Sequence, residues 1–286
     1  MGHIEVRLHA ARRTLVCLLL LLSNMMPVVP AAATGKADMV RLPGGAYRPL
    51  VSPEGAKVRV KPFRLDVAPV TNASFAAFVA THPSWAVQRV SSLFAEPRYL
   101  RHWAVRERRQ SQPAVQDAQR PVVNVSWFAA RAYCSAQGKR LPTIAEWEFA
   151  GRASAGAADG TREKDYVQRI LDWYAQPAGK PLPDVMQSRP NFWGVHDMHG
   201  VIWEWTQDFN ASQQQANQSN FQRLTINGRT VTVDVGPFCG VGAASVADPS
   251  DYAAFMRYSF RSSLKATFVL DTLGFRCAAD DGADSG

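Results

Sequence analysis

Closely spaced glycines and prolines constrain the fold of this chain more than any other feature of its sequence. The segments MVRLPGGAYRPL and KVRVKPFRLDVAPVT alternate apolar and polar residues around Gly44, Gly45 and Pro62, which is typical of short strands joined by turns. Further along, QPAGKPLPDVMQSRPN holds four prolines, and Gly194 and Gly200 interrupt NFWGVHDMHGVIWEWTQDF. Neither segment favours a long regular element, so we expect long loops.

Two short helices are predicted before residue 140. In NASFAAFVATH the apolar residues recur at helical spacing, and Thr71 or Asn72 is the expected N-cap. In SWFAARAYCSAQG, Ser126 is the expected N-cap and Gly138 the expected end.

A third helix is predicted within GKRLPTIAEWEFAGRA. Glu146 lies three residues after Thr143, which is the spacing of a capping box, and Pro142 precedes both. Trp147 and Ala150 then share the face that we expect to meet the core. These residues have a structural explanation before any catalytic one is needed.

The other segments contain no internal repeat. ASAGAADGTREKD is expected to form a turn-rich surface segment and FNASQQQANQSNFQR a polar loop, whereas FMRYSFRSSLKATFVLDTLGFRCAAD favours strand, loop and strand. Short elements and long loops in one large unit indicate an α+β domain without a doubly wound sheet.

The N-terminal segment has the order of residues found in secretory signal peptides. Three arginines precede a short apolar run at residues 15–22, and prolines and small residues follow up to Ala33. The run is shorter than the roughly 20 residues of a membrane-spanning helix, and no later stretch is longer. We therefore expect a signal peptide over residues 1–33, a domain over 38–281, no membrane span, and a periplasmic or secreted protein.

Cysteine usage agrees with export. Removal of the leader takes away Cys17 and leaves Cys134, Cys239 and Cys277. An odd number of cysteines in an oxidising compartment indicates one disulfide and one free thiol.

The basic balance does not indicate a nucleic-acid partner. The formal net charge is +8, but part of it leaves with the leader. A second group of arginines lies in one polar stretch that we interpret as a solvated loop: Arg98, Arg101, Arg106, Arg108 and Arg109. Nucleic-acid binding would need basic residues spread along one face among aromatic residues, so we expect no nucleic acid.

General catalytic motifs are absent from the sequence. It has no phosphate-binding glycine loop of either common spacing, no G-x-S-x-G and no C-x-x-C. His196 and His199 lie three apart, as two metal ligands on a helical turn would, but the broken segment favours a surface or hydrogen-bonding role. Nearly half of the chain is apolar, with eight Trp and fourteen Phe, so these patterns alone indicate an exported globular domain.

Several blocks in one order carry a family resemblance. MVRLPGGAYRPL, VAPVTNASFAAFV, RPVVNVSWFAARAYCSAQGKRLPTIAEWEFAGRA, NFWGVHDMHGVIWEWTQDF and LGFRCA together resemble the formylglycine-generating, or sulfatase-modifying, enzyme family. The KRLPTIAEWE, GVIWEW and GFRC blocks are the most specific. The resemblance implies a single compact α+β domain of this family, with little regular secondary structure and long loops, in which KRLPTIAEWE is chiefly architectural.

The resemblance also implies a chemistry that this chain does not match fully. Formylglycine generators hold copper(I) between two cysteines and use oxygen to convert a substrate cysteine to an aldehyde. Cys239 stands at the first position, but the second falls near Ala253, and no cysteine occurs from Gly240 to Arg276. Copper(I) prefers soft thiolates, so copper on Cys239 would need a His, a Met or a partner's ligand to complete the site.

Other matching positions supply the remaining candidate residues. The resemblance implies catalytic roles for Cys239, Trp205 and Arg261, and a buried acid as the partner of Arg276. It implies calcium near Glu204, but Gly200 is followed by Val201 and Ile202 where the family usually has Gly-Asn, and calcium prefers six or more oxygens. A calcium site is therefore not expected to be complete.

The resemblance further implies a disulfide between Cys134 and Cys277. It would leave Cys239 as the free thiol.

Three functions stay open at this point. The first is oxidative maturation of a protein or small-molecule substrate in the periplasm, by an oxidoreductase with a non-standard site. The second is a noncatalytic accessory or metal-delivery protein for a periplasmic redox enzyme. Family members without the copper pair include exported siderophore-maturation proteins and copper nitrite reductase accessory proteins. The sequence from residue 238 to 278 looks more like the nitrite reductase accessory proteins. The third is a true formylglycine-generating oxidase. A fold that hosts several functions does not choose among them.

Overall fold

The computed structural model describes residues 39–49, 57–106, 110–177, 179–210, 221–226, 229–234 and 249–282. The predicted signal peptide and Cys239 lie outside these described residues, so both stay predictions. No helix among the described residues is long and apolar enough to cross a membrane.

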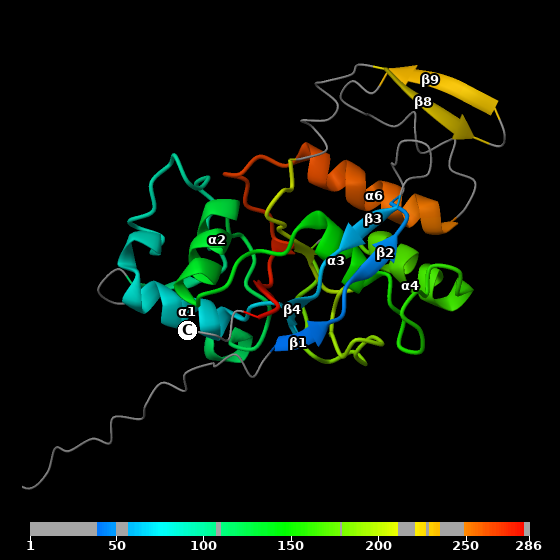
Figure 1. The fold of residues 1–286 in the computed structure, drawn as a ribbon. Coiled ribbons are helices and arrows are strands. Elements are labelled where there is room, and N and C mark those ends of the chain that lie inside the picture. The colour runs from blue at the N-terminus through cyan, green and yellow to red at the C-terminus, as the bar shows by residue number, and fades with distance from the viewer. Residues whose placement is uncertain are drawn as a thin grey trace, which may run out of the picture. The chain divides into compact units, whose positions relative to one another are not determined.

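A three-stranded antiparallel sheet joins the two ends of the described chain. Its order is β1 (Met39–Leu42), β4 (Phe63–Asp66) and β11 (Ala278–Asp280). Strands β1 and β4 lie side by side in Figure 1. In the central strand, Leu65 pairs with Val40 on one side and with Ala278 on the other. Leu42, Phe63 and Leu65 are almost completely buried, as the apolar positions of an alternating pattern should be.

The other strands form two-stranded pairs. They are β2 (Gly45–Tyr47) with β3 (Val58–Val60), β5 (Ala104–Arg106) with β6 (Gln110–Gln112), β7 (Trp203–Glu204) with β10 (Leu273–Gly274), and β8 (Phe221–Ile226) with β9 (Arg229–Asp234). Only β7 and β10 run parallel. Gly44 precedes β2 with a φ of +69°, and a Cβ there would lie 2.5 Å from the carbonyl oxygen of Val60. The first predicted turn therefore needs glycine.

Local capping places the three predicted helices. They are α1 (Asn72–Thr81), α2 (Trp127–Ala136) and α3 (Ile144–Gly151). The caps are Thr71, Ser126 and Thr143, and Thr143 with Glu146 completes the capping box. Thr71, and not Asn72, is therefore the cap of α1. Short 3₁₀ helices, η3 (Pro83–Trp85) and η5 (Val115–Asp117), lie in the following loops.

Two further helices revise the sequence-based interpretation. The prediction of a strand in FMRYSF is wrong, because α6 (Pro249–Ser263) runs through it. Helix α4 (Lys164–Tyr174) was not predicted, and it lies beside α6. Strand β8 begins inside the expected polar loop. Tertiary contacts explain α6, since Arg257 and Arg261 pair with α3 and the ring of Phe260 stacks on Trp203 at 4.4 Å.

The apolar core forms two main clusters. One lies around α1, α2 and the C-terminal segment, and includes Phe75, Tyr133 and Phe275. The other lies between the sheet and α3, and includes Trp147 and Ala150, as predicted. Cys134 of α2 and Cys277, next to β11, form a disulfide within the first cluster, and both are fully buried. The α+β fold with short elements and long loops is confirmed.

Candidate functional site

A buried acid on α3 is the centre of the candidate site. The capping box at Thr143 begins the helix, and the turn that follows directs Trp147 into the core. Glu148 is the next residue, and only 16% of its side chain is exposed. A carboxylate at this depth is retained only where cations or donors hold it.

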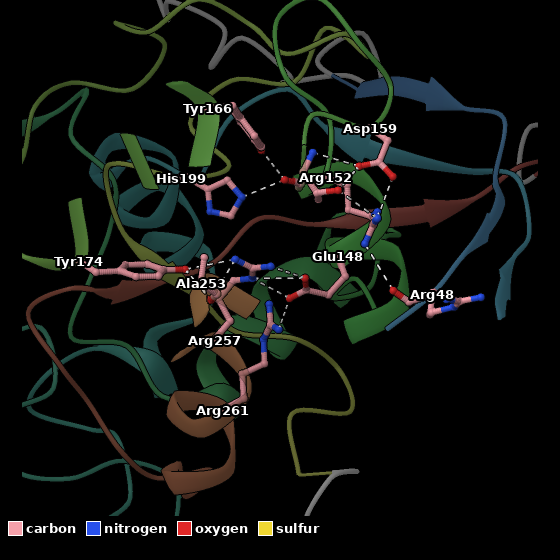
Figure 2. A network of polar contacts seen from close by, with 12 residues as sticks. Arg48, Glu148, Arg152, Asp159, Tyr166, Tyr174, His199, Ala253, Arg257 and Arg261 are labelled. Carbon is pink, nitrogen blue, oxygen red and sulfur yellow. Dashed lines mark hydrogen bonds and ion pairs between the residues drawn. The ribbon is translucent and has the colours of Figure 1, made fainter. Parts of the chain in front are cut away.

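Helix α6 supplies two cations to that acid. Arg257 and Arg261 are four residues apart, so they share one face of the helix. Nε and Nη2 of Arg257 lie 3.0 and 2.9 Å from Oε1 and Oε2 of Glu148, and Nη1 of Arg261 lies 2.5 Å from Oε1. Figure 2 shows both guanidinium groups directed at the carboxylate. Helices α3 and α6 are thus joined by a buried ionic cluster.

The charges of this cluster control its protonation. Burial alone would raise the pKa of Glu148, but the charges of Arg257 and then of Arg261 outweigh burial and hold that pKa well below its usual range. Glu148 is therefore ionised at any pH at which the protein functions.

A second layer of polar contacts surrounds Arg257. Its Nη1 donates to the Tyr174 hydroxyl at 3.3 Å and to the Ala253 carbonyl oxygen at 3.2 Å. The hydroxyl of Tyr174 lies 3.4 Å from the same carbonyl, and Tyr174 stacks on Trp203 with a centroid separation of 5.0 Å. All the donor nitrogens of Arg257 therefore have partners inside the domain.

His199 lies on the other side of the cluster. Its Nε2 is 2.9 Å from the Gly151 carbonyl oxygen, and its Nδ1 is shielded from solvent and has no hydrogen-bond partner among the described residues. Burial, and then the charge of Arg257, lowers the pKa of His199 to about 3. The imidazole is neutral at physiological pH, with Nε2 carrying the proton.

The predicted histidine pair does not form a ligand pair. Nδ1 of His196 lies 2.8 Å from the Ser188 carbonyl oxygen, so each imidazole has its own backbone partner. No group of three or more His, Cys, Asp or Glu side chains that could hold a metal exists among the described residues. The hydrogen-bonding role expected from the sequence describes both residues.

The two-thiolate copper site does not fit the described residues. Ala253 stands near the expected second cysteine, and this residue is 2% exposed, in a cluster with Tyr166 and Ile170. Cys134 and Cys277 are consumed in the disulfide. If the predicted signal peptide is removed together with Cys17, Cys239 is the one cysteine left to supply a thiolate.

The oxygens of Glu204 are already engaged. Both lie within 3.1 Å of the guanidinium of Arg276, and Oε2 also accepts from Nε1 of Trp147 at 2.8 Å. The side chains of Glu204 and Arg276 are both fully buried, so the expected acid partner of Arg276 is Glu204. A calcium ion would have to displace that arginine, so Glu204 does not fit a calcium ligand.

The two described catalytic candidates have different surroundings. Trp205 is fully buried and its Nε1 donates to the Val125 carbonyl oxygen at 2.9 Å, so it is a core residue. Arg261 lies over the ring of Trp147 at 4.7 Å, in contact with Glu148. Of the two, only Arg261 belongs to the cluster described above.

Sequence reasoning missed Glu148, Arg257 and Tyr174. The sequence did contain a signal for this cluster. If residues 249–263 had been predicted as a helix, Arg257 and Arg261, four residues apart, would have indicated that both contact the same anionic group.

Comparisons with known proteins extend these observations. The profile of the sulfatase-modifying factor enzyme 1-like domain matches residues 26–281. The bovine protein named inactive C-alpha-formylglycine-generating enzyme 2 is 31% identical, over 87% of this chain and 90% of its own length. The formylglycine-generating enzyme of Streptomyces coelicolor is 30% identical, over 86% and 90%. Among solved structures, that of CarF has a TM-score of 0.48 and 19% identity, covering 85% of this chain and 98% of its own.

Proposed function

Because the chain belongs to the formylglycine-generating, or sulfatase-modifying factor, enzyme family, we propose that it is an exported maturation protein that works without the two-thiolate copper site of that family. Its substrate would be a protein or a small molecule outside the cytoplasm. If it is catalytic, it would be an oxidoreductase whose reactive thiol is Cys239.

One observation carries the proposal. The position near the expected second cysteine is Ala253, whose methyl group is packed in the core and whose carbonyl oxygen receives hydrogen bonds from Arg257 and Tyr174. Linear copper(I) sites need two soft ligands; with Cys134 and Cys277 in the disulfide and Cys17 in the predicted leader, the mature chain would supply no second free thiolate. Relatives named as inactive and as formylglycine-generating are about equally similar, so similarity alone does not decide.

Export rests on two supports. The N-terminal residues have the order of a signal peptide, and the Cys134–Cys277 disulfide is a bond that persists in oxidising compartments. We therefore propose a periplasmic or secreted location.

The decisive experiment measures copper and oxygen together. Purified mature protein is titrated with copper(I) against a chromophoric chelator, and oxygen uptake is followed with a cysteine-containing sulfatase peptide. The Streptomyces coelicolor enzyme is the positive control, and Ala253→Cys is the matched variant. We expect neither tight copper binding nor peptide oxidation by the wild-type protein. Formylglycine in the peptide would instead establish a true formylglycine-generating oxidase and end the proposal.

A noncatalytic accessory or metal-delivery role is the second candidate. The buried alanine at position 253, near the expected second cysteine, favours this role as well. A protein that only binds a redox enzyme such as copper nitrite reductase needs no oxidation site of its own. Cys239→Ser separates the two candidates. Wild-type pathway output from this variant supports the accessory role, and complete loss of output with unchanged thermal stability supports a reactive Cys239.

A further inference from the structure

The two arginines of the cluster differ in how many of their donors are used. Arg257 uses all three of its side-chain nitrogens, in bonds to Glu148, Tyr174 and Ala253. Arg261 uses only Nη1, in its bond to Glu148. Its Nε and Nη2 donate to no residue that the structure describes, although only 8% of the side chain is exposed.

The unused nitrogens form one edge of the guanidinium. Trp147 covers the plane of the group, with the guanidinium carbon 4.7 Å from the ring centroid, and Glu148 occupies the Nη1 end. Nε and Nη2 are adjacent donors in a plane, and this fork matches the two oxygens of a carboxylate or a phosphate. An acceptor with two oxygens can satisfy both donors of this edge at once.

The acidic neighbours decide which oxyanion fits. Glu148 contacts Arg261 directly, and Asp208, which accepts from the Ile144 amide at 2.7 Å, interacts with it electrostatically. The charges of these two acids already balance those of Arg257 and Arg261. A carboxylate adds one negative charge, whereas phosphate adds up to two near neutral pH, so repulsion from the two acids disfavours phosphate. The hydroxyls of Tyr47 and Tyr174 are neutral polar groups in electrostatic range of Arg261.

We propose that the Nε–Nη2 edge of Arg261 is a subsite that binds a carboxylate group of the ligand. The inference deepens the proposed function and rests on it, since it names a chemical group that the substrate carries. It assigns Arg261 to ligand binding and Arg257 to holding α6 on α3.

Acetate is the probe for this subsite. Protein labelled with ¹⁵N in arginine and tryptophan is titrated with sodium acetate at pH 7, and sodium chloride keeps the ionic strength constant. The Trp147 indole signal reports in every variant, because its ring lies against Arg261. We expect a saturable shift of this signal and of the Arg261 Nε signal. A shift that stays linear in acetate, or that chloride reproduces, overturns the proposal.

Two variants and a second anion make the test specific. Arg261→Lys keeps the positive charge and removes the fork, so we expect acetate to bind at least tenfold more weakly. Arg120→Lys changes a surface pair with Asp117 and is expected to leave binding unchanged. Unaltered binding by a folded Arg261→Lys protein, or tighter binding of inorganic phosphate than of acetate, refutes the assignment. Formylglycine production would refute the proposed function without affecting this titration, so the two failures are distinguishable.

Discussion

Replacing each arginine of the buried cluster by methionine should give two very different losses of stability. Arg257→Met removes the three closest nitrogen–oxygen contacts between Arg257 and Glu148, at 2.9 to 3.2 Å, and leaves the carboxylate with one contact to Arg261. Breaking a buried ion pair by removing one partner costs about 3 to 5 kcal/mol. For a domain of this size, that loss lowers the melting temperature by roughly 10 °C.

Arg261→Met should cost much less. Glu148 keeps its three contacts to Arg257, and the loss is one hydrogen bond and a contact with the Trp147 ring. The methionine also removes the cost of keeping a largely buried charge out of water, which offsets part of that loss. We expect a decrease of about 1 kcal/mol in the free energy of unfolding.

Urea unfolding followed by tryptophan fluorescence, with the disulfide intact, measures both values. Glu148→Gln is the internal control, because it leaves two buried cations and should be at least as damaging as Arg257→Met. Equal losses for the two arginine variants would contradict the division of roles between them.

Four further predictions concern other parts of the chain. Cys134→Ser should lower the free energy of unfolding by about 5 kcal/mol in the chain-entropy model, since the disulfide closes a loop with a separation of 143 residues; a tryptic map with both cysteines alkylated before reduction would argue against the bond. Burial and the charge of Arg257 lower the pKa of His199 to about 3, so as the pH falls below about 6.5 the unfolded chain takes up a proton first and stability decreases. His199→Asn should flatten that decrease between pH 6 and pH 4, and parallel pH profiles for the two proteins would show that His199 does not titrate in this way. N-terminal sequencing of exported protein should begin just after Ala33, and recovery of Met1 would disprove cleavage. Intact mass spectrometry of the mature protein, from which Cys17 has been cleaved, should show one modified cysteine, Cys239, after iodoacetamide treatment without reduction, and a second modification would mean that another thiol is free.

Local sequence signals predicted the helices that depend on them. Thr71, Ser126 and Thr143 cap helices through hydrogen bonds to residues three positions later, so the information lies within one turn. The turn at Gly44 is similarly local, because its backbone conformation favours glycine.

Long-range contacts account for what the sequence did not reveal. Arg257 lies 109 residues from Glu148, and no local pattern connects them. The alternation in FMRYSF favours a strand, but the contacts of Arg257, Arg261 and Phe260 with other elements are made by one helix. The family resemblance indicated Arg261, but it did not indicate that Glu148, far away in the sequence, is its partner.

The position of β11 has a consequence for how the protein is made. The central strand β4 is available early in synthesis, but one of its edges waits for a strand that begins at Ala278. The same final segment delivers Arg276 to Glu204 and Cys277 to Cys134. Pairings this distant in sequence slow folding, and here they cannot form before residues 276–280 have been synthesised. A nascent chain stalled or truncated before residue 276 would therefore expose an unpaired strand edge and an unneutralised acid, which makes this short segment decisive for whether the preceding residues yield a folded product.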